Sequence, residues 1–357
     1  MIGDKPPSSS YGDAIGSPFL REQTWWPYLK HFSKYIERCG RELERGVPAV
    51  DILMYLGDDV NHKPSESKLL FGNRYKYDYL NNDVLMNALD VADGRLVIGA
   101  CPGCEPQTDS PTYRVLWIPK GTFLLPATEA KITAFAAKGA RVVRGDFEPD
   151  WPSPVKAMLG IEPSSLRGWY QRRDGDENIF FVVEKGGRSA FYFVKNGEVA
   201  VFDPVTGGRA SSPADMARGD TRPPKTASQI TLKPHENYPV RATKRLCEGT
   251  VKIENTTSEV RLDLGKVRDW ATVYVDGRKV AELWCEPYAC DITPYVKSGR
   301  DASIRVEVTS TWYNALVEDA KLPEEDRRTW TKFGPKPDAQ YHEAGLIGPV
   351  KLYCRHL

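Results

Sequence analysis

The amino-acid sequence predicts a multidomain fold: an open, mostly parallel α/β domain, then a small β domain, then a β-sandwich of jelly-roll type. Three observations predict it. The chain has 357 residues, more than one ordinary core accommodates. Strand-like and helix-like segments alternate between residues 49 and 150, as in parallel sheets with helices on both faces. From residue 246 onward, short segments alternate apolar and polar residues between turn residues.

The first regular element is a helix over residues 24–45. Thr24 is a candidate N-cap, Pro27 falls in the first turn, and Gly46 follows the last turn. Five apolar residues recur at three- and four-residue steps: Leu29, Phe32, Ile36, Cys39 and Leu43. This spacing predicts one buried stripe that another part of the protein must cover.

The middle of the chain changes from α/β to β patterning. Residues 49–150 predict a flavodoxin-like sheet of the kind also used by class I amidotransferases. Residues 167–203 contain short strands joined by Asp-Gly, Gly-Gly and Asn-Gly turns. The polar residues 209–226 predict a loop that is exposed or disordered. Residues 226–243 are expected to close the small β domain.

The last domain is predicted from its hairpins. Residues 260–264 and 271–275 alternate apolar and polar side chains, and Asp276-Gly277 predicts a tight turn into a third strand. Further strands are predicted at 303–312 and 348–353. This pattern indicates half-buried antiparallel strands in a sandwich.

Composition excludes several classes of partner. The net charge is +1 with acidic and basic residues interspersed, so neither nucleic acid nor a membrane surface is an expected partner. The sequence contains no run of eighteen apolar residues, so it predicts no membrane-spanning helix. The N-terminal residues lack the pattern of a signal peptide, so localisation stays unknown.

Several segments together resemble a known enzyme family. They are TWW at 24–26, FDPVTG at 202–207, LDLGKVRDWATVYVDG at 262–277, VEVTSTWYNAL at 306–316 and AGLIGPVKLY at 344–353. The chain resembles the C-terminal portion of α-L-rhamnosidase-like enzymes of glycoside hydrolase family 106, whose last domain is a galactose-binding-like sandwich similar to that of family 2 enzymes. The resemblance implies four parts: a remnant of the catalytic barrel (1–46), an α/β domain (47–158), a small β domain (159–245) and the sandwich (246–357).

The same resemblance implies a function and a setting. It implies carbohydrate as the ligand, a calcium-assisted sugar site, and a bacterial periplasmic or secreted enzyme. The catalytic carboxylates of the family lie earlier in the barrel than residues 1–46 reach, so no catalytic residue is assigned here. A barrel domain or separate barrel chain is the expected cover for helix 24–45. The alternative is a stand-alone, non-catalytic carbohydrate-binding or scaffold protein.

Candidate sugar-binding residues lie at both ends of the chain. Near the barrel remnant they are Arg21, Glu22 and Trp25, with Asp13 and Trp26 as further candidates. In the sandwich they are Trp312 and Asn314, together with Trp284, Tyr313 and His342. An aromatic ring can stack on a sugar and an amide can bind its hydroxyls. The structural alternatives are a polar loop before a helix for the first group and core packing for Trp284 and Trp312.

The cysteines suggest three further possibilities. Cys101 lies in a G-x-C-x-G sequence like the nucleophile elbow of amidotransferases, but a Pro-rich loop follows it instead of a helix. Cys101 and Cys104 could form half of a zinc site, although no second pair of ligands follows. A Cys285–Cys290 disulfide is also open, while mostly reduced, buried thiols are expected.

Overall fold

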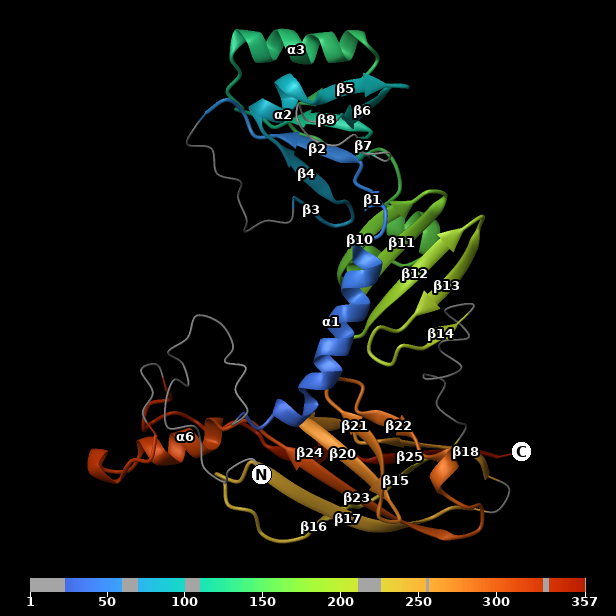
Figure 1. The fold of residues 1–357 in the computed structure, drawn as a ribbon, viewed down its shortest axis with the longest axis vertical. Helices are drawn as coiled ribbons and strands as arrows, with labels where there is room; N and C mark the ends of the chain where they lie inside the picture. Colours follow the sequence, from blue (N-terminus) through green and yellow to red (C-terminus); the bar gives the residue numbers. More distant parts are fainter. Residues whose placement is uncertain are drawn as a thin grey trace. The chain divides into compact units, whose positions relative to one another are not determined.

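The computed structural model describes residues 23–59, 70–99, 110–210, 226–254, 257–329 and 334–356. The chain divides into two compact units, one of Met1–Tyr35 with Thr221–Leu357 and one of Ile36–Asp220. Arg21, Glu22, Asp13, Cys101 and Cys104 lie outside the described residues. Within the described residues, no helix is both long and apolar enough to span a membrane. Figure 1 gives the elements of each unit.

The predicted N-terminal helix is present, but its apolar stripe is only part of its packing face. A 3₁₀ turn, η1 (Trp26–Tyr28), begins after Trp25 and leads into α1 (Leu29–Leu43). Phe32 is 40% exposed and Ile36 is 51% exposed, so the expected stripe is only partly covered. Cys39 of this stripe is buried and Phe32 contacts Trp284, and further contacts come from aromatic and charged residues at other positions of the helix.

The start of this helix packs on the β-sandwich in the first unit. The Tyr28 ring stacks on Trp270 at 6.1 Å between ring centres, and its hydroxyl lies 2.9 Å from the Thr272 hydroxyl. His31 Nε2 lies 2.9 Å from a carboxylate oxygen of Glu282. Residues about 250 positions apart are joined in this way, which local sequence patterns cannot reveal.

The end of α1 packs in the second unit and explains the FDPVTG motif. Arg38 donates hydrogen bonds to the carbonyl oxygens of Pro204 (3.0 Å) and Val205 (2.8 Å). Asp203 holds this loop closed, because its carboxylate accepts the Val205 N–H at 2.8 Å. Gly207 has a φ of +82°, and a Cβ there would lie 2.9 Å from the Arg38 guanidinium carbon. The FDPVTG loop therefore binds the side chain of Arg38.

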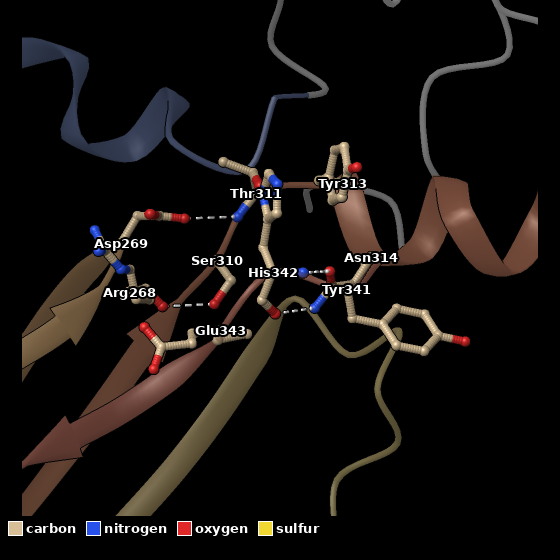
Figure 2. Close-up of a pocket in the computed structure, with 10 residues that line it drawn as sticks. Arg268, Asp269, Ser310, Thr311, Tyr313, Asn314, Tyr341, His342 and Glu343 are labelled. Atoms are coloured by element: carbon tan, nitrogen blue, oxygen red, sulfur yellow. Dashed lines mark hydrogen bonds between the residues drawn. The ribbon is translucent and has the colours of Figure 1, made fainter. Parts of the chain in front are cut away.

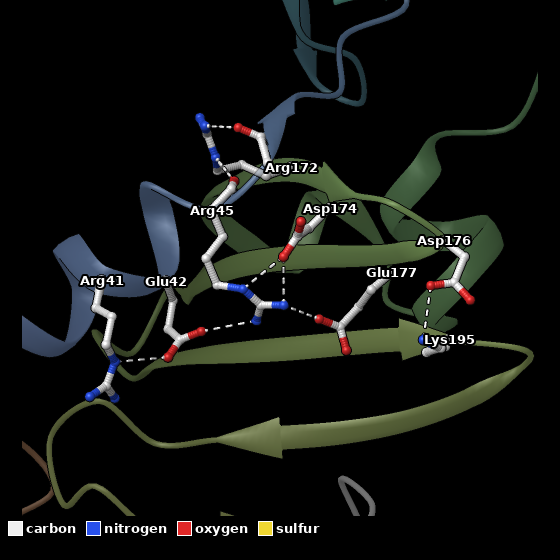
Figure 3. Close-up of polar contacts among 9 residues, drawn as sticks. Arg41, Glu42, Arg45, Arg172, Asp174, Asp176, Glu177 and Lys195 are labelled. Atoms are coloured by element: carbon white, nitrogen blue, oxygen red, sulfur yellow. Dashed lines mark hydrogen bonds and ion pairs between the residues drawn. The ribbon is translucent and has the colours of Figure 1, made fainter. Parts of the chain in front are cut away.

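An ion-pair network fixes the last turn of the same helix (Figure 3). Arg45 lies 2.8 Å from Asp174, 2.6 Å from Glu177 and 3.2 Å from Glu42, which is 3% exposed. Burial opposes the charge of Arg45, but the hydrogen bonds that it donates to these carboxylates outweigh this effect and raise the pKa of the guanidinium. The network ties α1 to the turn between two strands.

The α/β domain contains a four-stranded parallel sheet in the order β4-β2-β8-β9. Its strands are β2 (Ile52–Tyr55), β4 (Tyr77–Leu80), β8 (Val115–Ile118) and β9 (Arg141–Arg144). Counted along the chain, this order is 2-1-3-4, as in the flavodoxin-like arrangement. The expected parallel sheet is present.

Helices cover only one face of this sheet in the described part of the chain. The helices α2 (Asn82–Asn87) and α3 (Pro126–Ala137) bury Leu85, Ile132 and Phe135 against it. The opposite face is covered by aromatic side chains, among them Phe71, Tyr75, Trp117, Phe147 and Trp151. The expectation of helices on both faces is wrong because these rings, several from loops, bury that face without a helix.

Residues 95–98, which the sequence places in the parallel sheet, belong to a separate small sheet. The strands β5 (Leu89–Ala92), β6 (Arg95–Ile98) and β7 (Thr112–Tyr113) form an antiparallel sheet. The short β3 (Leu70–Asn73) precedes β4. A continuous apolar run fits either environment, so its pattern could not decide between them.

The small β domain is a six-stranded antiparallel sheet in the order β1-β10-β11-β12-β13-β14. Its strands are β1 (Val47–Pro48), β10 (Leu166–Asp174), β11 (Glu177–Glu184), β12 (Ser189–Lys195), β13 (Glu198–Phe202) and β14 (Arg209–Ala210). The Asn196-Gly197 turn has φ values of +53° and +82°, as a tight hairpin requires. The helix α4 (Pro154–Leu159) and the turn η2 (Pro163–Ser165) precede it.

Two antiparallel sheets form the sandwich around one core. The five-stranded sheet comprises β16 (Lys233–Pro234), β17 (Lys244–Lys252), β23 (Asp301–Thr309), β20 (Trp270–Val275) and β21 (Arg278–Leu283). The four-stranded sheet comprises β15 (Thr226–Gln229), β25 (Lys351–His356), β18 (Thr257–Asp263) and β22 (Ala289–Asp291). Buried Val273, Ile304 and Leu262 belong to one apolar cluster that both sheets share.

Smaller elements complete this unit. The strands β19 (Lys266–Arg268) and β24 (Gly345–Gly348) pair with each other. The remaining elements are η3 (Thr293–Tyr295), α6 (Tyr313–Ala320) and η4 (Glu324–Asp326). No disulfide joins Cys285 and Cys290.

The hairpin predicted at Asp276-Gly277 is present, whereas residues 226–234 belong to a different sheet than expected. Asp276 and Gly277 have φ values of +45° and +77°, and they join β20 to β21. Residues 226–234, expected to close the small β domain, instead pair with the sandwich: β15 with β25 and β16 with β17. Their partners lie more than 120 positions away in the case of β15, where Thr226 pairs with Cys354, so the local pattern predicted strands but not the sheet to which they belong.

Candidate functional site

The sandwich unit contains a pocket of about 550 Å³, which lies within the size range of small-molecule sites, roughly 300–1,000 Å³. It lies where β19 and β23 end and where α6 begins. Its lining residues are Arg268, Asp269, Ser310, Thr311, Tyr313, Asn314, Tyr341, His342, Glu343 and Ala344 (Figure 2).

Hydrogen bonds fix the first wall of the pocket. The Ser310 hydroxyl donates to the carbonyl oxygen of Arg268 at 2.6 Å. The Thr311 N–H donates to a carboxylate oxygen of Asp269 at 3.1 Å. These bonds join the segment after β19 to the segment after β23, so the strands of the five-stranded sheet position this wall.

The opposite wall is a loop held by one amide. Asn314, 7% exposed, donates from Nδ2 to the His342 carbonyl oxygen at 2.9 Å and accepts the His342 N–H at 2.8 Å. The His342 ring stacks on Tyr313 with 3.7 Å between ring centres and 6° between planes. Both rings are seen above this backbone clamp in Figure 2. The stack offers a flat aromatic edge to the pocket.

The carboxylates of the pocket already have partners. Glu343 pairs with Lys266, and this hydrogen bond lowers the pKa of Glu343. Asp269 accepts the Thr311 N–H. Glycoside hydrolysis requires one carboxyl able to donate a proton and a second able to act as base or nucleophile. A pocket with both carboxylates engaged in holding its walls is suited to binding a polar ligand.

The structure places the predicted sandwich residues differently. Asn314 lines the pocket, but its amide is used to hold His342, so it positions the wall. Trp312 is 4% exposed and lies at the start of α6, which leaves its ring no face for a ligand. Trp284 is half-buried and contacts Phe32 and Tyr35 edge-on. The core-packing alternative therefore describes Trp312.

Of the N-terminal candidates, only the tryptophans are described. Trp25 is half-buried, and its carbonyl oxygen accepts the Tyr28 N–H at 2.9 Å, which begins η1. Trp26 is the first residue of that turn. Sequence reasoning missed Arg268, Asp269 and Thr311. The only signal was their position, because polar residues at the ends of adjacent strands meet at one edge of a sheet.

The flavodoxin-like sheet has a second candidate location, the crevice between β2 and β8 where such folds bind ligands. One side chain bridges it. Asp58 accepts hydrogen bonds from the Tyr55 hydroxyl (2.6 Å), Asn82 (2.6 Å) and the Leu125 N–H (2.7 Å). Burial opposes its charge, but these bonds prevail and lower the pKa of Asp58. Because its carboxylate oxygens accept hydrogen bonds from the protein, the role of Asp58 is to hold these segments together.

The amidotransferase and metal hypotheses find no support in the described residues. Cys101 lies outside them, and β6, the strand before it, is antiparallel to β5 and lies outside the parallel sheet. A nucleophile elbow of that kind follows a strand of the parallel sheet. Across the described ranges, no three His, Cys, Asp or Glu side chains converge as a metal site. No calcium-assisted step is therefore derived for these residues.

Comparisons with known proteins indicate a glycoside-hydrolase-like protein. Residues 2–157 match the glycoside hydrolase family 106 model, which is described as alpha-L-rhamnosidase. The resemblance found in the sequence is thus confirmed over that part of the chain.

Two further similarities concern a solved structure and a curated protein. A rhamnosidase from Novosphingobium sp. PP1Y has the same fold over 94% of this chain, with a TM-score of 0.62 and 18% identity, and 42% of its own chain is covered. A Formosa agariphila protein provisionally named a beta-glucuronidase is 37% identical over 125 residues, which is 28% of this chain and 11% of that protein. The chain thus spans less than half of either relative.

Proposed function

We propose that this chain is the C-terminal accessory and sugar-binding part of a glycoside hydrolase acting on α-L-rhamnosides or related glycans, with the catalytic carboxylates outside it. The observation that carries the proposal is the match of residues 2–157 to the α-L-rhamnosidase family. The described residues form no closed barrel. A shared fold alone does not define an activity, so the proposal also depends on the pocket.

In this proposal the sandwich is a galactose-binding-like module of jelly-roll type, and its pocket receives the sugar. Its five- and four-stranded antiparallel sheets around one core support that assignment. The Thr311 hydroxyl makes no hydrogen bond within the described residues and can bind a sugar hydroxyl. The Tyr313–His342 stack can pack on the apolar edge of a pyranose ring.

A hydrolysis assay tests the division between binding and catalysis. The full chain is incubated with p-nitrophenyl α-L-rhamnopyranoside, beside an active rhamnosidase as the positive control. The proposal predicts no release of p-nitrophenol above the buffer rate. Saturable turnover by this chain would refute the assignment of the catalytic carboxylates elsewhere.

A second candidate is a stand-alone, non-catalytic carbohydrate-binding or scaffold protein, favoured by the complete core and pocket of the sandwich unit. Against it stand Phe32 and Ile36, exposed on α1, which support a barrel domain or chain as a partner. Analytical ultracentrifugation separates the two. A stable monomer that binds sugar indicates the stand-alone protein, and self-association indicates a chain that needs its partner.

A further inference from the structure

We propose that the sandwich pocket selects an acidic sugar, one that carries a carboxylate, and that Arg268 recognises this group. The inference deepens the proposed function and rests on its claim that the pocket binds carbohydrate. It follows from which charges in the pocket are already paired and which are not.

The negative charges of the pocket are used within the protein. Glu343 forms an ion pair with Lys266, which lies two residues before Arg268 on β19. The carboxylate of Asp269 accepts the Thr311 N–H at 3.1 Å, which closes the wall after β23. A hydrogen bond from an N–H to a carboxylate is stronger than one between neutral groups, so a ligand does not easily displace it.

The positive charge of Arg268 acts on neighbouring groups without direct contact, since it helps to lower the pKa of Glu343. Its guanidinium makes no ion pair and no hydrogen bond with any residue in the described ranges, and its side chain is exposed. Its backbone, by contrast, is fixed, because the Ser310 hydroxyl donates to the Arg268 carbonyl oxygen at 2.6 Å. Arg268 therefore presents a planar fork of donors from an anchored position at the pocket wall (Figure 2).

The chemistry of the fork favours a carboxylate. Guanidinium donors match the two oxygens of a carboxylate, and hydrogen bonds between charged groups are roughly twice as strong as those between neutral ones. A neutral sugar hydroxyl would satisfy only one donor without neutralising the charge. The stacked Tyr313 and His342 rings and the Thr311 hydroxyl remain available for the ring and its hydroxyls.

A sulfate ester offers the same oxyanion chemistry, so the experiment includes it. The full chain is titrated by calorimetry with methyl α-D-galactopyranoside, its C6-oxidised galacturonide, and galactose 6-sulfate. The first two probes differ only in a CH₂OH or a carboxylate. We expect the carboxylate probe to bind about tenfold more tightly than the neutral one, and this preference to fall as salt rises from 50 to 500 mM.

Three variants locate the preference. Arg268→Gln removes the charge and should make the neutral and carboxylate probes bind with equal affinity. Arg278→Gln is the matched control, since Arg278 is an exposed arginine at the other end of β20, after the Asp276-Gly277 turn. It should keep the full preference. Arg268→Lys retains the positive charge but lacks the planar pair of guanidinium donors, so it should keep only part of the preference for the carboxylate probe.

The outcomes separate this inference from the proposed function. Equal affinity of the wild-type chain for the neutral and carboxylate probes overturns the acidic-sugar inference and leaves carbohydrate binding intact. Tighter binding of the sulfate than of the carboxylate also overturns it. Failure of all three probes to bind overturns both the inference and the sugar-binding role. Because salt dependence is measured on the wild-type chain, the test does not depend on any variant folding.

Discussion

Asn314 gives the sharpest test of how the pocket is built. Its side-chain amide makes both a donated and an accepted hydrogen bond with the His342 backbone, at 2.9 and 2.8 Å, from a site only 7% exposed. Asn314→Ala removes both bonds and leaves two backbone groups without partners. At about 1 kcal/mol for each bond, the expected loss of local stability is about 2 kcal/mol.

Amide hydrogen exchange measures this loss directly. The His342 N–H is the group that Asn314 protects, and about 2 kcal/mol corresponds to an exchange rate about 30-fold higher, if that amide exchanges by local opening. Asn87→Ala serves as the control, since Asn87 makes only an exposed bond to Asp83 on α2. It should change unfolding by less than about 0.5 kcal/mol.

The result distinguishes two roles for Asn314. If it positions the wall, exchange at His342 rises and sugar affinity falls together. If exchange at His342 stays at the wild-type rate while sugar binding is lost, Asn314 contacts the ligand itself, and the account of the wall is wrong.

Three further perturbations test other parts of the fold. Gly207→Ala should destabilise the second unit by about 1–3 kcal/mol and speed amide exchange over residues 203–208, because φ is +82° and a Cβ would press on Arg38. An unchanged unfolding midpoint would contradict the described packing of this loop on Arg38. Asp58→Ala should lower the free energy of unfolding in urea by about 3 kcal/mol, since Tyr55, Asn82 and the Leu125 N–H each lose their shared acceptor. A loss below about 1 kcal/mol would show that these hydrogen bonds contribute little to stability. Burial opposes the charge of Glu282, but Lys30, His31 and Lys279 lower its pKa from 4.5 to about 2. The stability that ionised Glu282 adds is therefore present above pH 4.5 and is lost as the pH falls toward 2. Glu282→Gln should make stability fall less steeply with acid, and an equally steep fall would argue against this pairing.

Local patterns predicted the elements well where the chain itself supplies the reason. Asp276-Gly277 adopts the positive φ values that its residue types allow, and the turn joins the two strands predicted around it. The strand and helix segments of residues 49–150 likewise yield a parallel sheet. In the hairpin the partners are neighbours in sequence, so spacing and turn chemistry suffice. In the parallel sheet, where Ile52 pairs with Val115, the alternation of strands and helices indicated the sheet type but not the pairing.

The errors arise where distant residues decide the outcome. The stripe through Phe32 and Ile36 stays partly exposed, and Tyr28 and His31, on another part of the helix, find partners about 250 positions away. The site was predicted only in part, for a similar reason. Sequence reasoning named Asn314 and His342 but assigned Asn314 to the ligand, since the amide's partner, the His342 backbone, lies 28 positions further on.

The most direct test of the central claim is a crystal structure of the full chain grown with the methyl galacturonide at saturating concentration. The account predicts ordered sugar in the sandwich pocket, in contact with Arg268 and Thr311 and packed beside the Tyr313–His342 stack. An empty pocket at saturating sugar, or sugar bound only elsewhere on the chain, would contradict it.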